Sequence, residues 1–316
     1  MRHSLLILLL LVATAASAQQ ARSDPNKFAL IINGAGGEPA YAKQFEEWTT
    51  ELKSALSDHY GFGAQQTTVV PRATAEDVKR TFAQLKSQLD PNNVLFVFLI
   101  GHGSFDGKEA KFNLVGPDLS ASDYNALISA LPTHRIVVFN MASASGEFVK
   151  SLSAKGRIVV TATKSGQESN ATRFTGFFIA ALKAKDADTD QDGHVSVLEA
   201  FVYANRLTAD FYTRAGRLAT EHALLEDNGD GVGHEKAEAG EGLLARATYL
   251  DSLSIDEAAA SAATGRLMKE RTRLEGEIEQ LIARKQNMPE AEYDAALEKL
   301  FIELAKVNRS IKQAGS

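Results

Sequence analysis

Two residues that could take part in acid–base or nucleophilic chemistry each follow an apolar segment of the chain. His102 lies in Gly-His-Gly directly after the run 94–100, and Ser143 lies in Ala-Ser-Ala-Ser-Gly after the run that begins at Arg135. Continuous apolar runs of this length are typical of strands buried on both faces of a parallel sheet. Ligands of such sheets bind at the carboxyl ends of the strands. We therefore expect His102 and Ser143 to face one cleft.

These two segments resemble the caspase/legumain/gingipain clan of cysteine peptidases, and within it the legumain-like (C13) group. In that clan the second strand ends in Ala-Cys-x-Ser-Gly, whereas this chain has no cysteine and carries Ser143 at the nucleophile position. The resemblance implies that His102 is the catalytic histidine and that the N–H of Gly103 faces the oxyanion. It continues through two further segments, 161–168 and 172–178, and covers about residues 27–250.

A serine at the nucleophile position changes the expected activity. Its hydroxyl is far less acidic than a thiol, and the resembled clan lacks the buried carboxylate that orients the histidine of a Ser-His-Asp triad. A pair of residues tuned for a thiolate should work poorly with Ser143, which favours an inactive pseudopeptidase. Two alternatives remain: a peptidase or acyl hydrolase that uses Ser143 with His102, and a purely structural role for both residues.

Residues 188–199 match the EF-hand calcium loop at every diagnostic position. Acidic residues stand at loop positions 1, 3, 5 and 12, a glycine at 6, an apolar residue at 8 and a hydroxyl at 9. Helices expected over 174–184 and 197–207 flank the loop. A single loop of this kind favours a structural Ca²⁺ site over a sensor. The expected ligands are Asp188, Asp190, Asp192, the backbone carbonyl of His194, Ser196 and Glu199.

A second acidic segment, Glu226-Asp-Asn-Gly-Asp-Gly231, does not fit that template, because an alanine stands at its position 12. It is either a turn or an accessory acidic site. His222 and His234 lack metal-ligand spacing, so we expect both at the surface.

Strand-like and helix-like segments alternate between residues 27 and 162, separated at 104–120 by a polar stretch. This alternation predicts a mostly parallel sheet covered on both faces. The resemblance implies that this sheet belongs to a caspase-like three-layer α/β/α sandwich, with the calcium loop as an EF-hand-like insertion. The expected strands are 27–33, 67–71, one from Val94, one from Ile136 and 157–162; the expected helices are 41–59, one from Thr74, 122–131 and 147–153.

The C-terminal part, residues 255–312, is highly charged and carries apolar residues at helical spacing in two halves, with a break at 287–289. This pattern predicts a helical hairpin of coiled-coil type. The hairpin either packs on itself or the main domain, or forms the interface of a homo-oligomer. The expected division is a signal peptide at 1–18, a caspase/legumain-like domain at 19–250 and the hairpin at 251–316.

The N-terminus has the features of a secretory signal peptide. Arg2 precedes the apolar run 5–13, and Ala16-Ser-Ala18 fits a cleavage site. We expect export to the periplasm or beyond, with no membrane span after cleavage, since a span needs about 20 apolar residues. The net charge of −6 argues against a nucleic-acid partner. Without cysteine there are no disulfides, so stability must come from the core, to which a bound metal can add.

The sequence therefore predicts an exported, calcium-binding protein of caspase/legumain-like fold that lacks the catalytic cysteine and acts by binding a peptide or protein ligand. The alternatives are a hydrolase that uses Ser143 and a scaffold that assembles through its C-terminal hairpin. Hydrolysis would depend on Ser143, ligand binding on the cleft, and assembly on residues 255–312.

Overall fold

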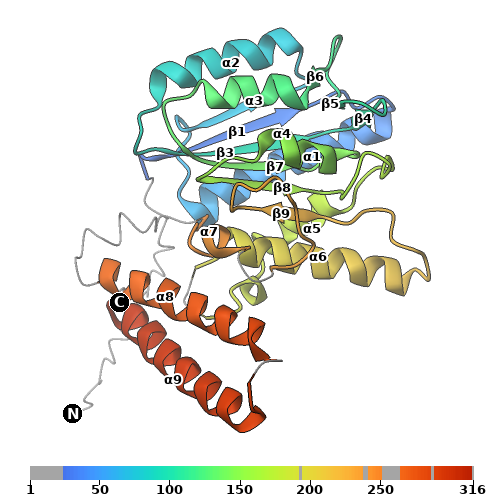
Figure 1. Ribbon diagram of the computed structural model, residues 1–316. Coiled ribbons are helices and arrows are strands. Elements are labelled where there is room, and N and C mark those ends of the chain that lie inside the picture. Colours follow the sequence, from blue (N-terminus) through green and yellow to red (C-terminus); the bar gives the residue numbers. More distant parts are fainter. Residues whose placement is uncertain (1–23, 192–193, 238–240, 251–263, 286–287, 315–316) are drawn as a thin grey trace, which may run out of the picture.

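The computed structural model describes residues 24–191, 194–237, 241–250, 264–285 and 288–314. The expected signal peptide, 1–18, lies outside these residues. Within them, a central sheet has the strand order β2-β1-β3-β7-β8-β9, in which the first five strands are parallel and β9 runs antiparallel to β8 (Figure 1). The strands are β1 (Lys27–Asn33), β2 (Thr67–Val70), β3 (Val94–Ile100), β7 (Arg135–Asn140), β8 (Arg157–Thr161) and β9 (Leu224–Glu226).

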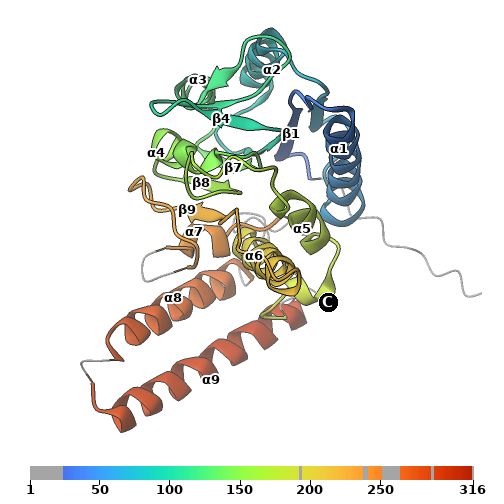
Figure 2. The same ribbon diagram turned by 90° about the vertical axis from the view of Figure 1, so that its right-hand side faces the viewer.

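Helices cover both faces of this sheet, so the expected three-layer α/β/α sandwich is confirmed. Every residue of β3 is buried, and successive side chains enter opposite cores: Phe96 and Phe98 one, Leu95 and Val97 the other. Figure 2 shows the two helical layers edge-on. One layer holds α1 (Pro39–Tyr60), α5 (Phe174–Ala181) and α6 (Val197–Arg214); the other holds α2 (Ala75–Gln88), α3 (Ala121–Ser129) and α4 (Phe148–Leu152).

Helix starts follow local side-chain chemistry. Thr74 opens α2, Ser120 opens α3 and Ser196 opens α6, each in a reciprocal capping box with the acidic residue three positions later. Helix α1 begins at Pro39, two residues before the expected start, because proline is well suited to the first helical position.

The polar stretch expected at 104–120 is not an irregular loop. It forms a small antiparallel sheet of β4 (Gly103–Phe105), β5 (Ala110–Phe112) and β6 (Leu119–Ser120). Strands of two or three residues are too short for a hydrophobic period to reveal them. The 3-10 turn η1 (Ser145–Glu147) takes the place of the helical start expected at 147. The helix expected over 174–184 ends at 181, and a second 3-10 turn, η2 (Lys185–Ala187), follows it.

The C-terminal part contains the short helix α7 (Leu243–Arg246) and the hairpin of α8 (Thr264–Ala283) and α9 (Glu290–Ala314) (Figure 1). Buried Ile311 of α9 packs on Tyr249, together with Leu267 and Val307. The hairpin thus packs on itself and touches the main body at Tyr249. None of the described helices is both long and apolar enough to cross a membrane.

Candidate functional site

The structure places His102 and Ser143 at the same edge of the sheet. His102 follows β3 and Ser143 follows β7, and these neighbouring parallel strands align Leu99 with Asn140. Each of the two residues lies three positions beyond that aligned pair. They therefore leave the sheet at one level, at the carboxyl edge where α/β sheets bind ligands.

The Ser143 hydroxyl is bound to the backbone of Gly103. Its Oγ accepts the N–H of Gly103 at 3.1 Å and donates to the carbonyl oxygen of Gly103 at 3.0 Å. Ser143 is 3% exposed. A Cβ at position 103 would lie 2.2 Å from the Ser143 carbonyl oxygen, so only glycine allows this approach. The N–H expected to face an oxyanion is therefore occupied by the serine itself.

The His102 ring packs against helix α1. Its centroid lies 4.9 Å from that of Tyr41 and 5.0 Å from that of Phe45, and both contacts are edge-on. Burial lowers the pKa of His102, only partly offset by a hydrogen bond to the backbone of Gly36 and by the charge of Glu38. The imidazole is therefore held mainly in its neutral form. The hydroxyl of Ser143 is hydrogen-bonded to the backbone of Gly103 instead.

The rest of the Ala-Ser-Ala-Ser-Gly turn anchors the chain to the end of β8. Ser145 Oγ accepts the N–H groups of Ala162 and Thr163 at 3.1 and 3.2 Å. A Cβ on Gly146 would lie 2.3 Å from the backbone of Lys164. Ser145 and Gly146 thus have a packing role that does not depend on catalysis.

A cavity of about 330 Å³ has in its wall Tyr41, whose ring contacts that of His102. Thr172, Arg173 and Arg217 also line it. Thr172 Oγ1 donates to the carbonyl of Met141 at 2.7 Å, which ties this wall to the end of β7. The carboxyl edge therefore offers a ligand a recess that carries two guanidinium groups.

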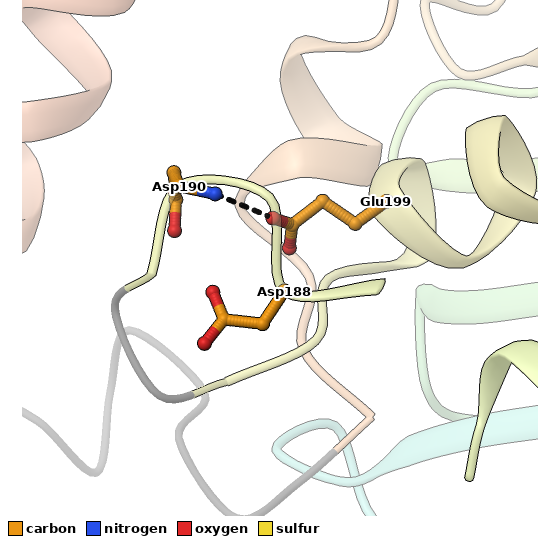
Figure 3. A group of neighbouring side chains, drawn as sticks. All are labelled: Asp188, Asp190 and Glu199. Carbon is orange, nitrogen blue, oxygen red and sulfur yellow. Dashed lines mark hydrogen bonds between the residues drawn. The ribbon is translucent and has the colours of Figure 1, made fainter. Parts of the chain in front are cut away.

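The acidic loop brings together three of its expected ligands. Carboxylate oxygens of Asp188, Asp190 and Glu199 lie within 4.8 Å of one another (Figure 3). Glu199 is buried, and its Oε1 accepts the backbone N–H groups of Thr189 and Asp190 at 2.8 and 3.3 Å. Clustered carboxylate oxygens suit a hard metal ion, so this group can hold one.

The remaining expected ligands are placed differently. Ser196 Oγ is buried and donates to Glu199 Oε2 at 2.9 Å while capping α6, so the structure uses this hydroxyl as a helix cap. The His194 ring lies edge-on to Tyr249 at 5.8 Å, in keeping with a ligand role for its carbonyl alone. Asp192 lies outside the described residues.

Two other parts of the chain brace this loop. Leu250 donates its N–H to the carbonyl of Val195 at 3.1 Å, and Val197 donates to Thr248 at 2.8 Å. From α8, Arg271 Nη1 lies 3.6 Å from Asp190 Oδ2, although Arg271 is only 3% exposed. The loop that could hold a metal is thus in contact with the C-terminal hairpin.

No family model matches this chain. No curated protein is similar enough to match it either. Among solved structures it is similar to the crystal structure of protein GSU0716 from Geobacter sulfurreducens, at 15% identity and a TM-score of 0.42, over 58% of this chain and 89% of that one. A similarity this distant carries no conclusion about function.

Sequence reasoning missed a carboxylate–imidazole pair next to the Ser143 turn. His222 Nδ1 lies 2.5 Å from Glu168 Oε1, and the Glu168 carbonyl accepts the N–H of Ala144 at 2.8 Å. His222 and His234, expected at the surface, are both half-buried. No sequence spacing could have shown this pair, because its two members come from distant segments that meet only in the fold.

Proposed function

We propose that this protein is a calcium-stabilised binding protein built on a caspase/legumain-like fold, which binds a peptide or protein ligand without cleaving it. The observation that supports a non-cleaving role is the bond between Ser143 and Gly103. A serine nucleophile must pass its proton to a base, and backbone N–H groups must be open to the oxyanion. Here the proton is directed at the Gly103 carbonyl and the Gly103 N–H is occupied.

The ligand in this proposal occupies the cavity lined by Tyr41, Arg173 and Arg217. Arg173 and Arg217 in its wall suit a carboxylate, because guanidinium groups bind carboxylates through paired hydrogen bonds. Peptides carry such groups at acidic side chains and at the C-terminus. We also propose that the protein is exported to the periplasm or beyond.

Calcium is the proposed ion of the loop 188–199. Ca²⁺ takes about six to eight oxygen ligands in flexible geometry, whereas Mg²⁺ demands a tighter octahedron and is seldom held by an all-protein cage. Asp188, Asp190 and Glu199 supply carboxylate oxygens from one short loop and the first turn of α6. Asp192 and the His194 carbonyl are the further ligands that the sequence pattern predicts.

Thermal unfolding of the protein in Ca²⁺ and in chelator tests this ion. An ion that binds only the folded state adds RT ln(1 + [L]/Kd) to the unfolding free energy, so calcium should raise the melting temperature. Asp188→Ala should reduce the gain. The control is Asp186→Ala, which removes an exposed carboxylate two residues earlier and should keep the gain. Equal melting temperatures of the wild type in calcium and in chelator would contradict the proposal.

A further inference from the structure

A second group of carboxylates surrounds the loop that follows β9. Leu225 and His234 exchange both backbone hydrogen bonds, at 2.9 and 2.8 Å, and so close the loop 226–233. Glu226 and Asp227 enter it buried, 0% and 5% exposed, whereas Asp230 lies at its exposed tip. Glu241, which is 3% exposed, lies beyond the loop in sequence, and its carboxylate accepts a hydrogen bond from Asn228 in the loop.

Backbone N–H groups fix Asp227 in position. Its Oδ1 accepts the N–H of Gly242 and its Oδ2 that of Ala245, both at 2.8 Å. Asp230 is held by the N–H of Val232, which donates to its Oδ1 at 2.7 Å. Each of these carboxylates still has free lone pairs, because an ionised carboxylate has about four acceptor positions.

Glu241 has one carboxylate oxygen near a possible positive charge, since His234 Nε2 lies 3.6 Å from its Oε1. The other oxygen, Glu241 Oε2, is buried and has no hydrogen-bond partner among the described residues. The same carboxylate faces that of Asp227, with the charge of Asp230 nearby. Burial and this neighbouring charge raise the pKa of Glu241 to about 8. A buried carboxylate in such surroundings is costly unless a proton or a cation neutralises it.

The amide of Asn228 marks where a cation would fit. Its Nδ2 lies 2.5 Å from Glu241 Oε1 and 3.3 Å from Asp230 Oδ2, so a partly positive N–H group bridges two carboxylates. The carboxylates here lie further apart than those of Asp188, Asp190 and Glu199, the one set of three such groups within 4.8 Å in the described chain. The Asn228 oxygen accepts the backbone N–H of Asp230 at 2.8 Å, which fixes the amide with its N–H group toward the carboxylates.

We propose that the carboxylates of Asp227, Asp230 and Glu241 form a second divalent-cation site, which takes the hard, oxygen-preferring ion Ca²⁺. The ion replaces the N–H bridge of Asn228 and supplies the partner that Glu241 Oε2 lacks. Carboxylate oxygens are among the ligands such an ion prefers. By joining Glu241 to the β9 loop, it fastens the edge strand of the sheet to the start of α7. This site does not depend on the loop 188–199.

Counting bound calcium by equilibrium dialysis of the full chain tests the site. The wild type should bind two equivalents, Asp188→Ala one, Glu241→Gln one and the double variant none. The control Glu235→Gln removes an exposed carboxylate just beyond the loop 226–233, and this variant should still bind two equivalents. If Glu241→Gln binds as many equivalents as the wild type, the second site does not exist. If instead the proposed calcium loop fails, Asp188→Ala equals the wild type while Glu241→Gln still loses one equivalent.

A second variant guards against misfolding. Asp230 is exposed, so Asp230→Asn should leave folding unchanged and weaken the same equivalent about ten-fold or more, since even outer-shell partners have effects of that size. Unchanged affinity in Asp230→Asn would overturn the proposal even if Glu241→Gln did not fold.

Discussion

The hydroxyl of Ser143 and the peptide groups of Gly103 satisfy one another, at 3.1 Å for the accepted N–H and 3.0 Å for the donated O–H. A serine suits this arrangement because a hydroxyl is both donor and acceptor, whereas a thiol is weak as either. The contact joins the end of β7 to the start of β4. The residue at the expected nucleophile position is thereby a structural link between two strands.

Replacing Ser143 by alanine should therefore reduce stability. Ser143→Ala leaves the Gly103 N–H and carbonyl without their partner, which should lower the free energy of unfolding by about 1–3 kcal/mol. Urea unfolding measures this change. The control Ser87→Ala removes an exposed helix hydroxyl and should change stability by less than about 0.5 kcal/mol. Equal effects of the two variants would mean that the Gly103 contact contributes nothing.

Peptide hydrolysis should depend on which residue stands at position 143. The wild type should not hydrolyse a peptide panel above background, whereas Ser143→Cys should gain weak activity, because a thiol of pKa about 8.5 yields some thiolate near neutral pH. The gain should be small, since His102 packs on α1 and the Gly103 N–H must first be released. Robust hydrolysis by the wild type that Ser143→Ala abolishes would instead establish a serine enzyme.

Most of the sandwich was predictable from sequence, because strands such as β3 and β7 are continuous apolar runs and helices such as α2 begin at capping boxes. The sequence also predicted the meeting of Asp188, Asp190 and Glu199, since their spacing is local. It could not predict β9 or the β4–β6 sheet, whose strands are too short to show a period. Nor could it predict the contact of Asp190 with Arg271, which depends on how a distant helix packs.

The pKa of His102 predicts a dependence of stability on pH. Burial lowers this pKa below its ordinary value of 6.5, so the unfolded chain binds a proton at a higher pH than the folded one. The contribution of His102 to stability is therefore complete above about pH 6.5 and is lost as the pH falls through the folded pKa. An NMR titration should give His102 a pKa below 6.5. His102→Gln should flatten the acid side of the stability profile, whereas His59→Gln, at an exposed position on α1, should not. A His102 pKa at or above 6.5 would contradict this account.

Arg271 should weaken calcium binding at the loop 188–199. Its guanidinium lies 3.6 Å from Asp190 Oδ2 and 5.3 Å from the ring centre of Tyr249, so a fixed positive charge competes with the ion. Arg271→Met should tighten calcium binding by a factor on the order of ten, measured by calorimetry. Arg273→Met removes an exposed arginine that pairs with Glu270 instead, and should leave the affinity unchanged. Weaker binding in Arg271→Met would show that the arginine organises the loop.

Removing the hairpin tests whether the sandwich is complete without it. We expect a chain that lacks residues 255–316 to remain folded, because both cores of the sheet are built from residues up to Leu250. The segment 248–250, which holds the loop 188–199 through Val195 and Val197, is kept. Tyr249 loses Ile311 and the guanidinium of Arg271, so the melting temperature should fall by a few degrees, roughly the effect of 1 kcal/mol in a domain of this size. Since Arg271 is also gone, calcium should bind this chain more tightly than the full-length protein. Circular dichroism measures the melting temperature of the shortened chain, and calcium titration measures its affinity for the ion. Loss of soluble protein on truncation would show that the hairpin covers part of the main core.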